Sequence, residues 1–277
     1  MRIVVTGAEG GLGRAFLGAC PSHHDVHAFA HQDLDVGDHH AVMQRIPPLG
    51  PELIVNCAAF TRVDACESDP GRAYRDNALG PQSLALAARV CGAMLVHVST
   101  DYVFDGTKEE PYDELDPANP LGVYGRSKLA GEAFVRALCP EHFVVRTGHV
   151  FGAGTDYLTG ALRRLSAGEA AGGIADRTGT PTYVKHLAER LLPLALSGRF
   201  GTYHLGGPEP TTWFDVLSRA KALGGLPGPV DVQRAEQLEL RAPRPHNSAL
   251  TSLFAAEVGV PPMPSLDEAL RDLLATL

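Results

Sequence analysis

The stretch Ile3-Val4-Val5-Thr6-Gly7-Ala8-Glu9-Gly10-Gly11-Leu12-Gly13 decides the fold, because an apolar strand runs directly into a glycine-rich turn that opens a helix. In such a turn the backbone amides and the helix N-terminus face the carboxyl end of the strand, a place that suits a pyrophosphate. Gly7 would permit the turn, Gly10 the close approach of a phosphate, and Gly13 the packing of helix on strand. Gly11 and Leu12 complete the predicted dinucleotide loop. A glycine-rich turn can also be only a tight turn, but its place after the first strand favours dinucleotide binding.

Strand-like and helix-like segments alternate through the first half of the chain. This alternation predicts a parallel sheet with helices on both faces, and the helical segments are long enough for right-handed crossovers. The predicted fold class is therefore α/β, a Rossmann-type doubly wound parallel sheet. The predicted strands are 3–6, 26–30, 53–57, 94–99 and 143–147, and the predicted helices are 12–20, 38–45, 71–90 and 123–138.

After residue 150 the alternation loosens into a loop-rich region. Helical stretches at 158–167 and 184–197 and a strand at 202–205 precede a Pro/Gly-rich passage. We expect a dinucleotide-binding domain over residues 1–150 and a smaller substrate-binding lobe over residues 151–277. No linker separates them, so the lobe should pack on the first domain, and chain crossovers between the two are left open.

Composition and charge narrow the class of protein. Of the 277 residues 44% are hydrophobic, which is enough for a substantial core, and no window approaches the roughly 18 apolar residues of a membrane span. With no leader pattern before the first strand, we expect a cytoplasmic protein. A net charge of -8 argues against a nucleic-acid partner, because that affinity comes mainly from Lys and Arg. Five widely spaced cysteines and the histidine-rich stretch 23–40 show no ligand spacing, so we predict neither a disulfide framework nor a metal site.

The end of the second predicted strand bears on the choice of cofactor. The acidic residue that would hold the ribose 2′-hydroxyl of NAD is not evident, since Ala30-His31-Gln32 occupies its place. Arg14 and His31 could instead face a 2′-phosphate, which favours NADPH with NADH tolerated. Asp35 and Val36 could contact adenine, although a carboxylate that caps the next helix is an equal alternative.

Tyr124 and Lys128 stand four residues apart in a predicted helix, so a phenol and an ammonium lie on one face. A neighbouring cation favours phenolate, so Lys128 could lower the pKa of Tyr124 from roughly 10 toward the operating pH, where the phenol can protonate a carbonyl. The same spacing also arises where a lysine stem only packs along a tyrosine ring. Ser99 and Thr100 end the fourth strand and bring hydroxyls to the edge of the sheet where ligands bind.

This order of motifs resembles the extended branch of the short-chain dehydrogenase/reductase superfamily and, within it, the dTDP-4-dehydrorhamnose reductase family. The resemblance covers nearly the whole chain. It is carried by Ser99 through Gly106, Pro111-Tyr112-x-Glu114-x-Asp116, Tyr124-Gly125-x-Ser127-Lys128-x-x-Gly131-Glu132, Ala58-Ala59-Phe60-Thr61-x-Val63-Asp64-x-x-Glu67, Asn77, Gly179-x-Pro181-Thr182, Thr211-Thr212-Trp213 and Arg244-Pro245-x-Asn247-Ser248.

The resemblance implies a nucleotide-sugar enzyme that reduces the C4 ketone of a dTDP-6-deoxy-4-keto-L-hexose with NADPH and gives dTDP-L-rhamnose or a related sugar. Tyr124 would be the general acid, Lys128 would lower its pKa and bind the nicotinamide ribose, and Thr100 would hold the carbonyl in reach of hydride. Asp101 and Tyr102 would contact the sugar or support the site. Further cofactor contacts are implied at Ala58, Ala59, Asn77 and Ser99.

Substrate recognition should come from the second lobe. The resemblance implies that Arg244 contacts the dTDP diphosphate with help from Asn247 and Ser248, with a surface turn as the alternative. Trp213 follows a helix N-cap pattern, which favours packing over stacking on the nucleotide. His149 departs from the family, whose rhamnose-forming members commonly carry tryptophan there, and so leaves the deoxysugar open.

Other members of the fold leave further functions open. Nucleotide-sugar epimerases and dehydratases share the fold and the Tyr/Lys pair, and a related branch serves as a non-catalytic NADP-binding regulatory subunit of methionine adenosyltransferase. The resemblance also leaves a homodimer open, and no glutamate cluster marks an interfacial Mg²⁺ site.

Overall fold

A computed structural model describes residues 1–277 and is built on a parallel sheet of six strands. The strand order is β10-β5-β4-β3-β1-β2, and every neighbouring pair is parallel. The predicted α/β class with a doubly wound sheet is confirmed, and each of the five predicted strands ends within one residue of an observed strand. The strands are Arg2–Thr6 (β1), Asp25–Phe29 (β2), Leu53–Asn56 (β3), Met94–Thr100 (β4), His142–Thr147 (β5) and Gly201–His204 (β10).

The first strand, β1, lies where the direction of winding reverses. β2 pairs with one side of β1, and β3 then pairs with the other side, so the chain builds the sheet outward in two directions from β1. Loops leaving the carboxyl ends of β1 and β3 must therefore diverge and open a crevice between them. The glycine-rich turn follows β1 at this point.

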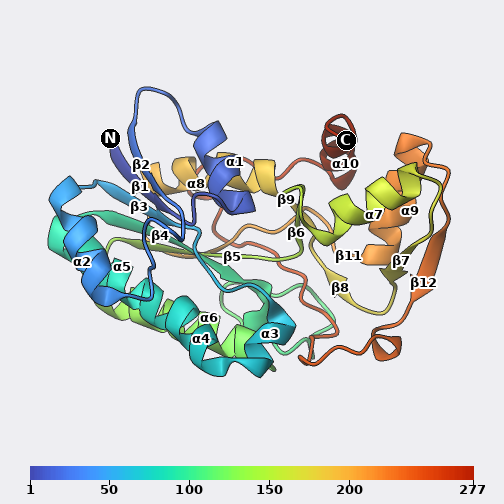
Figure 1. Cartoon of the computed structure of the whole chain (residues 1–277), viewed down its shortest axis with the longest axis horizontal. Helices are drawn as coiled ribbons and strands as arrows, with labels where there is room; N and C mark the ends of the chain where they lie inside the picture. Colours follow the sequence, from blue (N-terminus) through green and yellow to red (C-terminus); the bar gives the residue numbers. More distant parts are fainter.

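Two layers of helices cover the two faces of the sheet, as Figure 1 shows. Side chains along β1 alternate between the faces, so Ile3 joins the hydrophobic core that also contains Leu187, whereas Val4 joins the core that contains Leu84. One face carries α1 (Gly11–Ala19) and α8 (Val184–Leu196); the other carries α2 (His39–Arg45), α3 (Val63–Ser68), α4 (Pro70–Tyr74), α5 (Gly80–Cys91) and α6 (Val123–Leu138).

The helix predicted over 71–90 is divided in the structure. A π-helical segment, Arg75–Leu79, separates α4 from α5. Pro81 has no N–H to donate to the Asn77 carbonyl four residues earlier, so a regular α-helical hydrogen bond is missing at this point. Helix α6 also packs closely here, since a Cβ added to Gly131 would lie 2.2 Å from the Asn77 carbonyl oxygen.

The second lobe has its own core, but the chain passes between the lobe and the sheet more than once. Helix α8 and strand β10 come from the C-terminal half of the chain but belong to the sheet layers. The two predicted domains, 1–150 and 151–277, therefore stay a prediction, with the chain crossing between them. The lobe contains β6 (Val150–Phe151), α7 (Tyr157–Ser166), β7 (Ala171–Ile174), β8 (Thr178–Gly179), β9 (Thr182–Tyr183), β11 (Thr211–Thr212), α9 (Trp213–Gly224), β12 (Val230–Gln233) and α10 (Leu266–Leu274).

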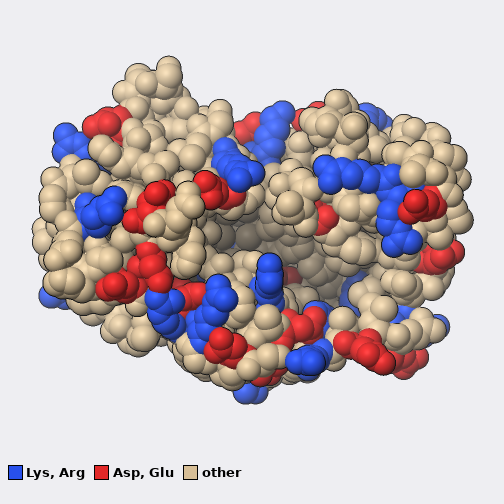
Figure 2. All heavy atoms as spheres, in the orientation of Figure 1, with Lys and Arg blue, Asp and Glu red and all other residues tan.

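The molecular surface is hollowed between the sheet layers and the second lobe, as the space-filling view shows (Figure 2). The carboxyl ends of β1, β3 and β4 and the start of α6 border this hollow on the sheet side. No helix of the structure combines the length and the apolar character needed to cross a membrane.

Candidate active site

The glycine turn after β1 is shaped by two close backbone approaches. Gly7 has φ +69°, and a Cβ on it would lie 2.6 Å from the backbone N of Ala58 on the β3 side. A Cβ on Gly13 would lie 2.2 Å from the carbonyl oxygen of Gly7, so the first turn of α1 can sit against the loop only without a side chain there. The first amide of α1 to reach a backbone carbonyl is that of Arg14, so the amides of Gly11 and Leu12 remain available to an anion.

Two cavities meet at this turn and form one continuous groove. A cavity of about 240 Å³ is lined by Gly7, His31, Asp35 and Val36, among others. A larger cavity of about 600 Å³ extends toward the second lobe. The residues that line both are Gly10, Cys57 and Ala59.

The larger cavity brings together the three residues predicted to be catalytic. Thr100 reaches it from the end of β4, and Tyr124 and Lys128 reach it from the first turns of α6. Gly11, Leu12 and Ser99 line it as well. Leu12 and Ser99 are 87 positions apart in the sequence and still line one cavity, because parallel strands and their following loops end at the same edge.

The electrostatics of Tyr124 and Lys128 differ from the expectation. Burial raises the pKa of Tyr124 well above its ordinary value, an effect that the Thr100 hydroxyl opposes and Asp101 reinforces. Lys128 is only 2% exposed and donates a 2.7 Å hydrogen bond to the carbonyl of Val98. Burial lowers the pKa of Lys128 to about 8. The expected lowering of the Tyr124 pKa is therefore wrong for this chain, because burial of the phenol is the largest influence on its pKa and Lys128 is not among the groups that shift it.

Thr100 is fixed by a short chain of hydrogen bonds that reaches the second lobe. Its hydroxyl donates to Asp101 Oδ1 at 2.9 Å and accepts from the backbone N–H of Tyr102 at 3.1 Å. Asp101 Oδ2 accepts from the hydroxyl of Ser248 at 2.6 Å. Asp101 is buried, and burial raises the pKa of its carboxyl despite these bonds. The Thr100 proton is thus engaged, and one lone pair of its oxygen remains free to accept a hydrogen bond from a ligand.

His149 forms the second-lobe side of the larger cavity in an unusual conformation. It is the one non-glycine residue with a positive φ, at +49°, and its Nδ1 is buried with no hydrogen-bond partner. Its ring stacks on Trp213 with 5.3 Å between centroids, and a Cβ on Gly179 would lie 2.3 Å from the ring. Trp213 follows Thr212, whose hydroxyl caps α9 by accepting from Asp215 N–H, so Trp213 has the packing role that the sequence favoured.

Arg244 and Asn247 do not line the groove. Arg244 makes a bidentate pair with Asp64, with distances of 3.0 and 2.8 Å. The Asn247 amide donates to the carbonyls of residues 108–110, which holds that loop. Both side chains are therefore committed to the fold, and the structure offers no support for their predicted contact with a diphosphate.

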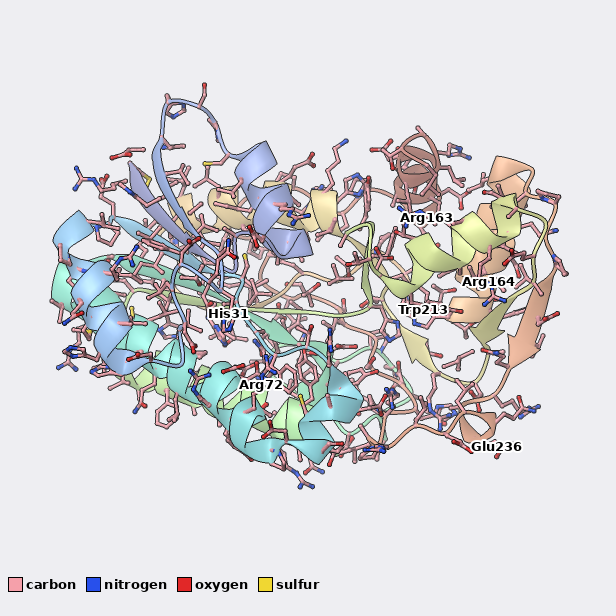
Figure 3. The ribbon with its side chains drawn as sticks, viewed as in Figure 1. His31, Arg72, Arg163, Arg164, Trp213 and Glu236 are labelled. Atoms are coloured by element: carbon pink, nitrogen blue, oxygen red, sulfur yellow. The ribbon has the colours of Figure 1, made fainter.

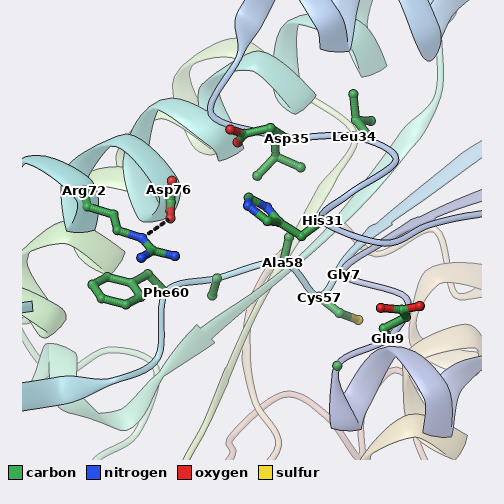
Figure 4. A pocket seen from close by; sticks show the side chains of 13 residues that line it. Gly7, Glu9, His31, Leu34, Asp35, Cys57, Ala58, Phe60, Arg72 and Asp76 are labelled. Atoms are coloured by element: carbon green, nitrogen blue, oxygen red, sulfur yellow. Dashed lines mark hydrogen bonds and ion pairs between the residues drawn. The ribbon is translucent and has the colours of Figure 1, made fainter. Parts of the chain in front are cut away.

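The smaller cavity shows which residues surround its outer end (Figure 4). Asp35 pairs with Arg75, and the cap of α2 is Asp38, which accepts from Ala41 N–H at 3.1 Å, so the capping alternative for Asp35 was wrong. Arg14 is exposed on α1 and does not line this cavity. Asn77 is buried and holds the backbone of Phe60 instead of lining the groove.

Sequence reasoning missed Arg72, which lines this outer end from α4. His31 and Arg72 both lie on the sheet side of the molecule, whereas Trp213 lies on the second lobe with Arg163 and Arg164 nearby (Figure 3). No motif or spacing marks Arg72, because its place depends on how α4 packs against α3 and α6.

Comparison with known proteins gives one consistent family. The family described as "RmlD substrate binding domain" matches residues 1–277. The chain is 37% identical to a dTDP-4-dehydrorhamnose reductase of Mycolicibacterium smegmatis, over 100% of this chain and 86% of the relative. It is 41% identical to the reductase of the same name from Mycobacterium tuberculosis, over 99% and 92%. The crystal structure of dTDP-4-dehydrorhamnose reductase from Bacillus anthracis in complex with NADP superposes with a TM-score of 0.96 at 32% identity, covering 100% of this chain and 99% of that one.

Proposed function

Because the chain belongs to the RmlD substrate binding domain family, we propose that it reduces the C4 ketone of a dTDP-6-deoxy-4-keto-L-hexose and gives dTDP-L-rhamnose or a closely related sugar. The observation that carries this proposal is that Thr100, Tyr124 and Lys128 line one cavity that is continuous with the glycine turn. A hydride donor along the groove and a proton donor beside it are the two groups that ketone reduction needs.

The groove fits a nicotinamide dinucleotide, and NADPH is the cofactor that we propose. Gly11 and Leu12 offer backbone amides at the start of α1. Ala58 and Ala59 line the groove with small side chains, which leave room for the cofactor. When bound, NADPH supplies the hydride. The NADP complex of the Bacillus anthracis relative supports this choice. Measuring kcat/KM with each cofactor tests it, and a hundredfold preference for NADH would contradict it.

Tyr124 donates the proton to the ketone oxygen. Since burial raises its pKa, Tyr124 stays a phenol throughout the physiological range and keeps the proton that a general acid must deliver. Lys128 lies one helical turn further along the same face, where its ammonium stabilises the negative charge that grows on the phenol oxygen and contacts the ribose. The Thr100 oxygen, fixed by Asp101, orients the phenol or a sugar hydroxyl.

The sugar occupies the end of the larger cavity bordered by His149, Tyr102 and Asp101. The imidazole makes this side more polar than a tryptophan would, which favours a sugar that presents a hydroxyl there. Five free cysteines are in keeping with the reducing cytoplasm, where we propose that the enzyme acts.

The deciding experiment is a turnover assay with synthetic dTDP-4-keto-6-deoxy-L-hexose and NADPH, with the product identified by NMR. Absorbance of NADPH should fall in step with the ketosugar consumed. Turnover without net loss of NADPH would indicate an epimerase, and no turnover at all would favour a non-catalytic NADP-binding role.

Replacing Tyr124 by Phe tests the acid directly. As the usual contribution of general acid catalysis, kcat should fall by roughly a hundredfold or more, with the affinity for NADP⁺ kept. An unchanged kcat in Y124F would remove Tyr124 from the mechanism.

A further inference from the structure

The outer end of the groove has little carboxylate left to accept a hydrogen bond. Asp35 is paired with Arg75. Asp76 accepts from Arg75 Nη1 at 2.8 Å and from Arg72 Nε at 3.3 Å. The remaining carboxylate, Glu9, lies apart at the glycine turn (Figure 4). A 2′-hydroxyl of ribose, which needs such an acceptor, therefore finds no free carboxylate beside His31.

The guanidinium of Arg72 is held in place yet keeps free donors. Its plane lies over the Phe60 ring, with 4.4 Å from the Arg72 Cζ to the ring centroid, and its Nε is tied to Asp76. Phe60 is itself fixed, because Asn77 accepts from its N–H at 2.8 Å and donates to its carbonyl at 3.0 Å. The two Nη atoms of Arg72 make no hydrogen bond within the chain, and the side chain is 52% exposed. The guanidinium of Arg72 is thus held in one orientation, and its two Nη atoms have no hydrogen-bond partner within the chain.

His31 brings a second uncommitted group to the same space. It follows β2, is exposed, and makes no hydrogen bond within the chain. Figure 4 shows its imidazole and the Arg72 guanidinium on opposite sides of the cavity, both turned toward the space between them. The Nη atoms of Arg72 and the ring nitrogens of His31 therefore make no polar contact that holds the fold.

We propose that Arg72, assisted by His31, forms the anion subsite that receives the 2′-phosphate of NADPH and so sets the preference for NADPH over NADH. A phosphate dianion is the ligand for which a planar arginine fork is best suited, because it accepts two parallel hydrogen bonds. This assignment rests on the proposed function only for the dinucleotide. It also replaces Arg14, which does not line the cavity, by Arg72 as the second cation of the subsite.

The test is calorimetric binding of NADP⁺ and NAD⁺ to the full chain without sugar. Removing the fork in R72Q should raise the Kd for NADP⁺ by roughly tenfold or more, as expected for lost bonds to a charged group, and change the Kd for NAD⁺ less than threefold. The matched control R14Q removes an exposed arginine of α1, on the other face of the sheet, and should leave both constants unchanged. In the wild type, added salt should weaken NADP⁺ more than NAD⁺, and R72Q should lose most of that difference.

Equal weakening of both nucleotides in R72Q would assign Arg72 to adenine packing and overturn the proposal, and so would unchanged affinities. H31Q provides an independent variant, with a smaller but still NADP⁺-selective loss expected. The two proposals fail differently: without the subsite the enzyme turns over but binds both nucleotides alike, whereas without the proposed function NADP⁺ binds selectively and no ketosugar is reduced.

Discussion

The Thr100 hydroxyl donates to the Asp101 carboxylate at 2.9 Å, and through Asp101 it is tied to Ser248 of the C-terminal segment. This bond fixes the direction of the threonine proton. The oxygen of Thr100 is left to face the cavity in which Tyr124 lies, so Thr100 acts on its surroundings as an acceptor. The orientation of the predicted acid therefore depends on a contact made by residues 147 positions apart.

Replacing Thr100 by Val should lower kcat by roughly 10- to 100-fold, the range expected when one well-placed hydrogen bond at the reacting group is lost. The matched variant T100S keeps the hydroxyl and should retain most of the activity. Stopped-flow turnover gives kcat, and calorimetry should show an unchanged Kd for NADP⁺. Wild-type activity in T100V would mean that the threonine only ends the strand.

The pH dependence of activity should follow Lys128. Burial lowers its pKa to about 8, so the ammonium is lost as the pH rises through that value, and kcat/KM for NADPH should fall on the alkaline side. The contribution of Lys128 to the stability of the fold should instead increase as the pH rises. Between about pH 8 and the ordinary lysine pKa the unfolded chain binds more protons, so the free energy of unfolding gains with pH. A rate profile that stays flat from pH 7 to 10, or equally steep in Lys128→Met, would contradict the assignment.

His149 should control the fluorescence of the protein. Trp213 is the sole tryptophan and stacks on the His149 ring, so protonation of the imidazole should quench its emission. Burial lowers the pKa of His149 more than Asp101 raises it, and quenching should therefore appear only as the pH falls below the ordinary histidine range of roughly 6.5. The variant H149F should remove the titration. Quenching that persists in H149F would have another source.

The ion pair between Asp64 and Arg244 should contribute modestly to stability. Asp64 is 41% exposed, so solvent screening limits the loss in Asp64→Asn to roughly 1 kcal/mol, or a fall in Tm of about 2–4 °C for a chain of this size. Arg244 lowers the pKa of Asp64 to about 2, so the difference from wild type should persist down to about pH 4 and vanish as the pH falls toward 2. Asp267→Asn, which removes an exposed pair at 3.8 Å, is the control and should leave Tm unchanged.

Local patterns were sufficient to predict most of the fold. Strands β1 to β5 follow from short apolar runs, and helix α6 was predicted with its observed ends. Both predictions succeed because the spacing of buried positions along a strand or helix depends only on residues close together in the sequence. The residues predicted to be catalytic were named from their motifs and the family resemblance, and the structure brings them to one cavity because parallel strands place the end of β4 and the start of α6 at the same edge. The division of 71–90 was missed because Pro81 and the close approach of Gly131 act together.

The sequence by itself determined the doubly wound sheet, the glycine turn and the meeting of Thr100, Tyr124 and Lys128. Only the tertiary structure decided that Arg244 is committed to Asp64, that Arg72 faces the outer groove, and that the phenol is made a weaker acid instead of a stronger one. The physical reason is range. Strand and helix patterns depend on residues a few positions apart, whereas ion pairing and desolvation depend on every group that folding brings near, and those groups come from distant parts of the chain.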